Sequence, residues 1–306
     1  MGPTEDVDNN LINVYINLIT VDNSASRPLK TVTIARNKTR KTKELRQFIL
    51  EHVSKNSQGI GTQTAQAFGI SRQAVSRHLH EMVEEGLLTA SGKTKARTYA
   101  LNKIVGQTFA FNVTKDTAED VIWIESIRPL LMDLKKNVLD ICEHGFTEMV
   151  NNVVSHSDSK YLAVSVERTA LDTTITVLDT GVGIFNKIKN DFNLHDPRHA
   201  ILELCKGKFT SDPVHHSGEG IFFTSKMFDR FSIFSGSLFF SSSTGDDEAW
   251  LIETEHDAKI KYLEGTSVFM KIGESSNRVA KEVFDTYASE DANWDFSKTH
   301  IVLKLL

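Results

Sequence analysis

Three short segments of this chain carry residue types that suit a phosphorylated ligand. Glu148 and Asn152 lie four residues apart in FTEMVNNVVSHS, and residues four apart share one face of a helix. A carboxylate there can activate water, and an amide oxygen can hold a metal ion. Two glycine-containing segments follow, LDTGVGIF at 178–185 and HSGEGIFFTSKMF at 216–228. This order of segments predicts a nucleotide pocket.

The first glycine segment predicts a site for an adenine base. Asp179 ends an apolar, β-branched run at 174–178, which predicts a buried strand. A carboxylate at that strand end can accept a hydrogen bond from the amino group of adenine, which guanine lacks at that position. Gly181 and Gly183 would let the backbone pass close to a flat base.

The second glycine segment predicts a site for phosphate. Gly218 and Gly220 open a run at 221–228 that has the composition of a helix. The free N–H groups and the positive dipole end of such a helix would face phosphate oxygens. Mg²⁺ prefers oxygen ligands, so the Asn152 amide oxygen and the phosphates would suit it. Each signal alone is common in proteins, but together and in this order they indicate ATP.

In this order the segments resemble the GHKL ATPases, the superfamily of gyrase, the heat-shock chaperones, histidine kinases and the mismatch-repair ATPases. The resemblance covers roughly residues 107–273. It implies an α+β fold built on an α/β sandwich of mixed sheet and helices, with Mg-ATP as the ligand and a mobile lid between the glycine segments. The residues that match are Glu148, Asn152, Asp179, Gly181, Gly183, Gly218, Gly220, Gly265 and Thr266.

The resemblance makes Glu148 the general base and Asn152 the magnesium ligand. The residues between the glycine segments predict the lid itself. Asp196 followed by Pro197 predicts the start of a short helix. In the polar stretch after it, Lys206 and Lys208 could reach the γ-phosphate, although each alone is equally well explained as a solvated surface lysine.

Positive charge is concentrated near the N-terminus, although the net charge of the chain is −5. Seven basic residues lie between Lys30 and Arg46, against the single acid Glu44. The segment at 62–88 then predicts a helix, a tight turn at Gly69 and a second helix. Such a run of charge is often only a solvated face, so the helical pattern after it decides the interpretation.

The helical pattern resembles a winged helix-turn-helix over about 41–102. In such modules the start of the recognition helix reaches base edges in the major groove. The wing at 88–101 carries basic residues that suit phosphate contact. Because winged helices also dock proteins, that role stays open beside binding of double-stranded DNA. The expected DNA-contacting residues are Arg72, Gln73, Ser76, Arg77, Lys93, Lys95 and Arg97.

Length and composition allow more than one domain, since 306 residues with 40% hydrophobic content can bury a full core. We expect a β-hairpin-like extension at 1–40, the winged helix at 41–104, the ATP-binding domain at 105–274 and a helix-strand segment at 275–306. In proteins that combine these two domains in this order, the last segment often leads into a STAS-like module. We therefore expect the natural chain to continue beyond Leu306.

Further elements follow from local pattern. Residues 109–113 predict the first strand of the ATP-binding domain, and Thr117 would cap a helix that runs to Ile127. Residues 278–288 predict a helix, and 299–306 predict a strand.

Several classes of protein and site are disfavoured. No apolar run approaches the roughly 20 residues of a membrane span, and the polar, acidic start is unlike a secretory signal. Cys142 and Cys205 lie far apart without a CxxC, which favours reduced thiols in a cytoplasmic protein. His80-Glu81 resembles a kinase phosphoacceptor but lacks the second long helix of a dimerisation hairpin. Pro197 interrupts a zinc set that would consist of His195, His199, Cys205, His215 and His216.

Three functions remain. The first, which we prefer, is an ATPase that controls a DNA-binding winged helix as a regulator or defence-type switch, with room for a homodimer. The second is a serine/threonine kinase of the anti-sigma type that acts on a STAS-like partner. The third is a nucleotide-sensing module without turnover, which Glu148 argues against because a sensor needs no general base.

Overall fold

The computed structural model describes residues 40–200, 220–243, 248–253, 263–287 and 302–305. Within them, α-helices combine with one large sheet and a small hairpin, so the fold class is α+β as the sequence predicts. The extension expected at 1–40 lies outside the described residues except for Arg40. No helix in the described part of the chain has the length and apolar character that a membrane crossing requires.

The first described elements are three helices and a hairpin. They are α2 (Arg40–Val53), α3 (Ile60–Phe68), α4 (Arg72–Glu84), β1 (Leu88–Ser91) and β2 (Thr98–Leu101). The two strands pair antiparallel, with a 3-10 turn at Thr94–Ala96 between them. Gly69 makes the turn after α3 with a φ of 62°, a conformation that glycine adopts without strain. The hydroxyl oxygen of Ser71 then caps α4 by accepting from the Ala74 N–H at 3.2 Å.

These helices enclose a hydrophobic core of their own, formed by side chains at helical spacing. The buried members include Leu45, Ile49, Val53, Ile60, Ala65, Val75, Leu79, Met82 and Leu88. Arg46, counted above in the basic run, is buried and paired with Glu85 at the end of α4. Arg46 therefore ties α2 to α4 and is not part of a solvated basic face.

The large sheet has eight strands in the order β10-β8-β7-β6-β9-β5-β4-β3. All neighbours pair antiparallel except β10 and β8, which are parallel, so the sheet is mixed. The strands are β3 (Val105–Asn112), β4 (Tyr161–Arg168), β5 (Asp172–Asp179), β6 (Arg230–Gly236), β7 (Leu238–Ser243), β8 (Glu248–Glu253), β9 (Leu263–Gly273) and β10 (Val302–Leu305).

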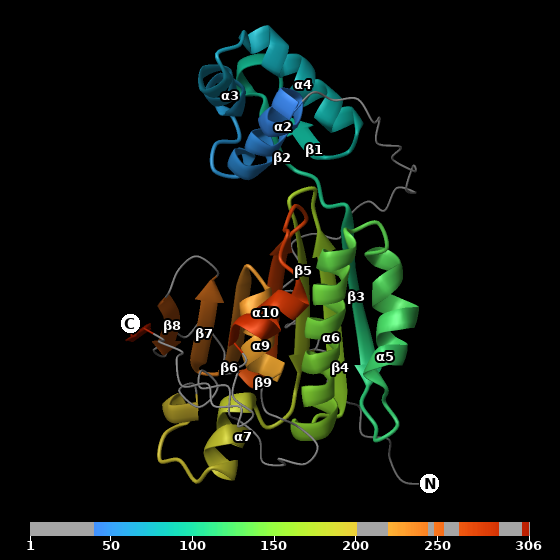
Figure 1. Ribbon diagram of the computed structural model, residues 1–306, viewed down its shortest axis with the longest axis vertical. Coiled ribbons are helices and arrows are strands. Elements are labelled where there is room, and N and C mark those ends of the chain that lie inside the picture. The colour runs from blue at the N-terminus through green and yellow to red at the C-terminus, as the bar shows by residue number, and fades with distance from the viewer. Residues whose placement is uncertain (1–39, 201–219, 244–247, 254–262, 288–301, 306) are drawn as a thin grey trace. The chain divides into compact units, whose positions relative to one another are not determined.

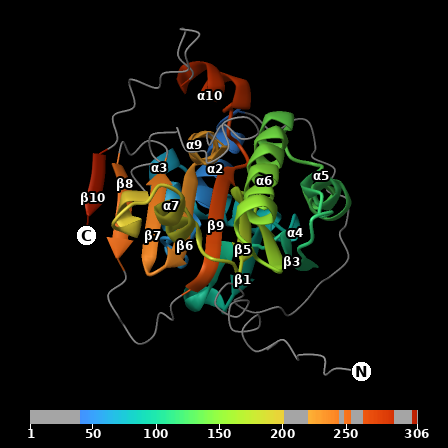
Figure 2. The ribbon, with the colours of Figure 1, turned by 90° about the horizontal axis from the view of Figure 1, so that it is seen from below.

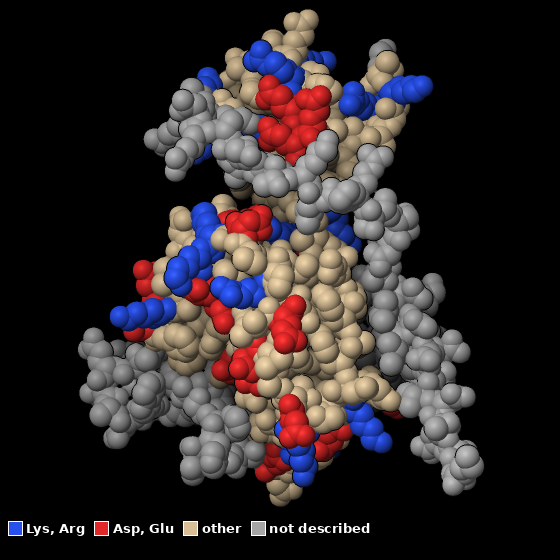
Figure 3. Space-filling view, turned by 90° about the vertical axis from the view of Figure 1, so that its right-hand side faces the viewer, with Lys and Arg blue, Asp and Glu red and all other residues tan. Residues whose placement is uncertain are grey.

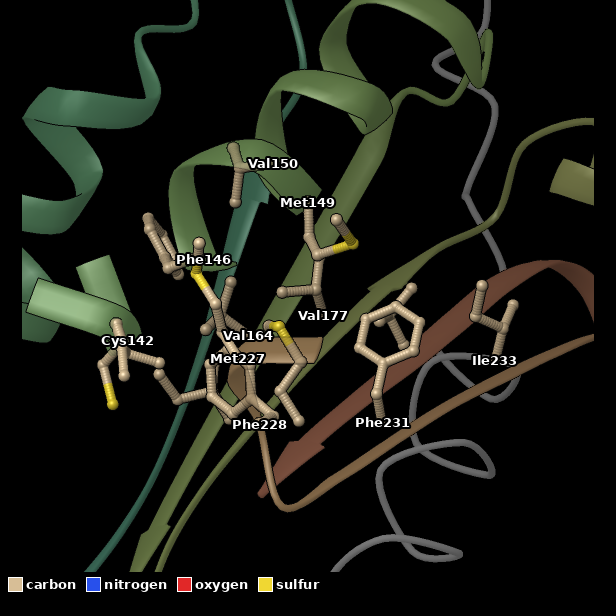
Figure 4. Close-up of a cluster of buried hydrophobic side chains, with 14 of the residues drawn as sticks. Cys142, Phe146, Met149, Val150, Val164, Val177, Met227, Phe228, Phe231 and Ile233 are labelled. Atoms are coloured by element: carbon tan, nitrogen blue, oxygen red, sulfur yellow. The ribbon is translucent and has the colours of Figure 1, made fainter. Parts of the chain in front are cut away.

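Helices α6 (Lys136–His156), α9 (Gly220–Met227) and α10 (Ala280–Tyr287) cover one face of this sheet (Figures 1 and 2). The strand register places apolar residues side by side under them, because Val164, Val177, Val268 and Ile233 are successive cross-strand partners. From above, Phe146, Met149 and Val150 of α6 close the core (Figure 4). Cys142 lies in the same core, where burial raises its thiol pKa to about 12.

The helix after β3 differs from the prediction. The Thr117 hydroxyl does not cap it, because that oxygen accepts from the Thr114 N–H at 2.8 Å in the preceding turn. Instead, α5 (Glu119–Ile122) begins after Ala118 without a side-chain cap. It then widens into a π-helical turn, Trp123–Ile127, and a 3-10 turn, Arg128–Leu130. The α-helical and π-helical residues end at Ile127, as predicted, and Pro129 lies within the 3-10 turn that follows.

A buried ion cluster joins segments at the opposite end of β5 from Asp179. The Arg168 guanidinium, from the end of β4, is 5% exposed and pairs with Asp133 before α6 and Glu274 after β9. Burial raises the pKa of the Glu274 carboxyl, and the bond from Arg168 opposes that rise. The cluster thus links three elements of the sheet and its helical layer at one point.

Candidate functional site

The site lies at one end of three neighbouring strands in the middle of the sheet, β5, β9 and β6. The antiparallel register pairs Asp179 of β5 with Thr266 of β9. On its other side, Thr266 pairs with Ser235 of β6. All three residues are buried, with exposures of 3% for Asp179, 7% for Thr266 and 3% for Ser235. Residues far apart in the sequence therefore form one polar row.

Asp179 is held by donors from both sides. Its Oδ1 accepts from the Gly181 N–H at 2.8 Å, and the carboxylate also accepts from the hydroxyl and the N–H of Thr266. Burial raises the pKa of the Asp179 carboxyl from its ordinary 3.8 to about 6, and these hydrogen bonds oppose that rise. A carboxylate offers about four lone-pair positions. The Gly181 N–H uses one of them, and Thr266 also bonds to the carboxylate without filling it, so a donor on a ligand can still be accepted.

Thr266 connects Asp179 to the next helix. While its hydroxyl donates to Asp179, the same oxygen accepts from the Ile184 N–H at 2.9 Å. Ile184 is the first residue of α7 (Ile184–Asp191). Beside it, the Ser235 hydroxyl donates to the Gly265 carbonyl at 2.7 Å. These bonds fix the backbone around Asp179 without any ligand.

The glycines of the first segment have neighbours within the protein. A Cβ on Gly181 would lie 1.9 Å from the Ser157 carbonyl oxygen, at the end of α6. A Cβ on Gly183 would lie 2.6 Å from the Ser235 Oγ, and its φ of 81° also disfavours a side chain. Close packing of the loop against α6 and β6 is therefore sufficient to require both glycines. Approach to a base, as the sequence suggested, is an additional role and not the sole reason for them.

Glu148 and Asn152 lie one turn apart on α6, as predicted, and both are half-buried. The Glu148 carboxylate reaches the start of α9, where a Cβ on Gly220 would lie 1.9 Å from its Oε2. Glu148 of α6 and the second glycine segment thus meet directly, although 72 residues separate them in the chain.

Asn152 has the properties that a magnesium ligand needs. Its amide oxygen is a hard donor of the kind that Mg²⁺ prefers. Within the described part of the chain its side chain makes no hydrogen bond, so the oxygen is available. By contrast, no cluster of three or more His, Cys, Asp or Glu among the described residues could hold a metal by itself. The Asn152 oxygen therefore suits one position in the ligand shell of such an ion.

Several predicted residues cannot be placed. Lys206, Lys208 and Gly218 lie outside the described residues, as do Cys205, His215 and His216 of the disfavoured zinc set. The start of the short helix that the sequence predicts after Asp196 is described. The Asp196 Oδ1 accepts from the Arg198 N–H at 2.8 Å, and residues 197–200 are helical, so the predicted start is confirmed.

The residues predicted to contact DNA lie at the surface where the structure describes them. Arg72, Gln73, Ser76 and Arg77 are exposed on the first half of α4. The second half carries acidic partners of two histidines, with His78 3.4 Å from Glu81 and His80 3.3 Å from Glu84. Figure 3 shows Lys and Arg near an acidic group in the upper part of the view, where Figure 1 labels α2, α3 and α4.

The hairpin adds basic residues at its tip. Lys93 and Arg97 flank the 3-10 turn and are exposed, and the Arg97 guanidinium lies 5.5 Å from the centre of the Tyr99 ring. Lys95 lies within the turn. Basic surface is therefore present on both the helix start and the hairpin tip.

Two features of the site escaped the sequence interpretation. Ser235 was missed because nothing in its strand distinguishes it, and only the register of β6 with β9 brings it to the site. The contact between Glu148 and Gly220 was missed because it depends on how α6 and α9 pack. Alternation along β6 could at most have indicated which face Ser235 takes.

Comparison of the sequence with models of known protein families gave no match, and comparison with curated proteins gave none either.

Proposed function

We propose that this chain is a Mg-ATP-dependent ATPase of the GHKL type whose nucleotide state controls a winged helix-turn-helix that binds double-stranded DNA. The proposal rests on two contacts, each of which joins segments that are far apart in the sequence. The Glu148 side chain of α6 contacts Gly220 of α9, and Asp179 at the end of β5 contacts Thr266 of β9. Those are the residues that match the superfamily pattern.

Adenine recognition would depend on Asp179. The carboxylate is buried, so water does not compete with a ligand that donates a hydrogen bond to it. The carboxylate keeps room for a further donor beside the N–H of Gly181 and the bonds from Thr266. The exocyclic amino group of adenine would supply the missing donor, whereas the carbonyl of guanine would face the carboxylate as a second acceptor. The site should therefore prefer ATP over GTP.

Hydrolysis would depend on Glu148. Its carboxylate is half-buried and lies against the start of α9. From there it can orient a water molecule and take its proton, which in general is worth about 10²–10⁴-fold in rate. Asn152, one turn further along α6, would hold Mg²⁺, and this ion would neutralise charge on the phosphates. Lys206 and Lys208 are candidates for γ-phosphate contact. Gly181, Gly183, Gly218 and Gly220 would line the base and phosphate positions.

DNA binding would depend on the first half of α4 and on the hairpin. Ser71 caps α4, so the positive end of the helix dipole and the exposed Arg72 and Arg77 lie at the same end. The acidic second half of α4 would stay away from phosphates. Lys93 and Arg97 of the hairpin would then contact the DNA backbone, in the manner of a wing.

Isothermal calorimetry with Mg-ATP and Mg-GTP tests the nucleotide claim. We expect binding of ATP and at least about tenfold weaker binding of GTP, since an unpaired buried acceptor costs about 1–3 kcal/mol. Equal affinities for the two nucleotides would contradict the proposed recognition of adenine by Asp179. The isosteric Thr266→Val variant is a useful companion, because it removes the hydroxyl that bonds to Asp179 and to the Ile184 N–H while the Asp179 carboxylate itself stays.

ATP labelled on its γ-phosphate tests the reaction. Release of inorganic phosphate by the chain alone supports hydrolysis. Transfer of the label to a STAS-like protein would favour the anti-sigma type of kinase instead, and ATP binding with neither result would leave a nucleotide sensor. Gel-shift titration at low salt, with and without ATP, tests DNA. No duplex binding in either condition would assign the winged helix to protein docking.

A further inference from the structure

The start of α9 has no room for a side chain because the Glu148 carboxylate lies there. A Cβ on Gly220 would be 1.9 Å from Oε2 and 2.8 Å from Cδ of Glu148. Non-bonded carbon atoms do not approach oxygen this closely. The carboxylate therefore lies in the space that the side chain of any other residue at position 220 would take.

Backbone conformation does not explain this glycine. Gly220 is helical, and alanine is favoured over glycine in a right-handed helix. Gly183 and Gly265 differ in this respect, because their φ angles of 81° and 99° themselves favour glycine. At position 220 the three atoms nearest to an added Cβ all belong to the Glu148 side chain, so a side chain there would compete with that carboxylate for space.

The two helices cannot easily separate to make room. A Cβ on Gly145 of α6 would lie 2.4 Å from the Phe228 ring, which directly follows α9. Phe228 is fully buried in the core. Helix α6 thus closely approaches both the start of α9 and the residue that follows it. A methyl group added at position 220 would therefore move the more flexible partner, the Glu148 side chain.

We propose that Gly220 is a positioning residue for the Glu148 carboxylate. The missing side chain lets the carboxylate lie against the first turn of α9, where the positive end of the helix dipole favours a negative charge. This assignment deepens the proposed function, on which the role of Glu148 as general base rests. It differs from a role in which Gly220 serves only the approach of phosphate.

The test is a double-mutant cycle with Gly220→Ala. In the otherwise unchanged protein we expect kcat to fall by about 10²-fold, since displacement of a catalytic group by about 1 Å costs that much. The Kd for ATP should stay within about threefold. In a Glu148→Asp background, whose shorter side chain does not reach position 220, Gly220→Ala should lower kcat by less than about threefold. Equal losses of kcat in both backgrounds would overturn the proposal.

A role confined to phosphate approach gives a different result. In that case Gly220→Ala would weaken ATP binding by tenfold or more in both backgrounds, and that outcome also overturns the proposal. Gly61→Ala is the matched control. Gly61 is also helical, and a Cβ there would make an ordinary contact, 3.6 Å from the Leu79 Cδ1. It should leave kcat and Kd unchanged.

Thermal unfolding keeps the proposal testable if the chain does not hydrolyse ATP. We compare the shift in Tm that Gly220→Ala causes in two backgrounds. The shift should be about 1–3 °C more positive in Glu148→Ala than in the unchanged protein, because the Glu148→Ala variant has no carboxylate in the space next to position 220. Gly61→Ala should shift Tm equally in both. Equal shifts for Gly220→Ala would show that the carboxylate does not occupy this space, whereas absence of phosphate release with unequal shifts would reject only the proposed reaction.

Discussion

Replacement of Asp179 with asparagine should change how the stability of the free protein depends on pH. The carboxylate is 3% exposed, and burial raises its pKa from 3.8 to about 6. Folding therefore favours the protonated form. The contribution of this group to stability is fully present below pH 3.8 and is lost as the pH rises through about 6. Asp179→Asn removes that loss, because asparagine has no proton to release in this range.

The magnitude follows from the size of the shift. A rise of about two pKa units, at about 1.4 kcal/mol per unit, corresponds to about 3 kcal/mol in total. The linkage relation gives how the contribution of Asp179 to the free energy of unfolding changes with pH. About 2 kcal/mol of this contribution is lost between pH 4 and pH 6, and little more is lost above pH 7. Over that interval the free energy of unfolding of Asp179→Asn should rise by about 2 kcal/mol relative to the unchanged protein. Whatever the amide does to its own hydrogen bonds adds an offset that does not depend on pH.

Urea denaturation at several pH values between 4 and 8, followed by tryptophan fluorescence, measures this difference. Thr176→Val is the matched control. Thr176 is a buried residue of the same strand and carries no titrating group, so its effect should be the same at every pH. A constant difference between Asp179→Asn and the unchanged protein from pH 4 to pH 6 would refute the buried, ionisable Asp179 on which adenine recognition depends.

Three further outcomes are expected. Glu148→Gln should retain ATP with a Kd near that of the unchanged protein while phosphate release falls by about 10²–10⁴-fold, and unchanged release would remove its role as base. Arg168→Met should lower the free energy of unfolding by about 1–3 kcal/mol, since Glu274 loses its bond to a buried cation while the exposed Asp133 can be solvated. Lys136→Met, at an exposed pair, should change it by less than about 1 kcal/mol. Arg72→Ala should weaken duplex binding by about 1–3 kcal/mol at preferred sequences, whereas Lys93→Ala should weaken all sequences alike and reduce the salt slope by about 1. A gel-shift series over salt concentration separates the last two.

The elements that carry the site could be predicted from local pattern. The apolar run that ends at Asp179 is strand β5, the Glu148–Asn152 pair lies on helix α6, and α9 begins within one residue of the predicted start. Periodicity carries this information because each of these elements buries one side or both. At 88–101, where the resemblance implied a wing, the structure has the antiparallel pair β1 and β2.

What could not be predicted depends on contacts between distant segments. Thr117 has the residue type of a helix cap, but its hydroxyl is used by the turn at Thr114, so α5 begins without it. Arg46 was counted in a basic run and is buried against Glu85 because α2 and α4 pack together. Local composition cannot distinguish a charged residue in solvent from one that forms an ion pair with a residue far away in the sequence.

The glycines show the same limit and indicate how the site is prepared for a ligand. Gly181 packs on the Ser157 carbonyl and Gly183 on the Ser235 hydroxyl, so both have reasons that involve only the protein. That packing in turn aims the Gly181 N–H at Asp179. The carboxylate is therefore oriented before any nucleotide arrives, and a ligand that bonds to it loses little additional conformational entropy of the protein. We therefore expect the proposed adenine contact to form with little rearrangement of the protein around Asp179.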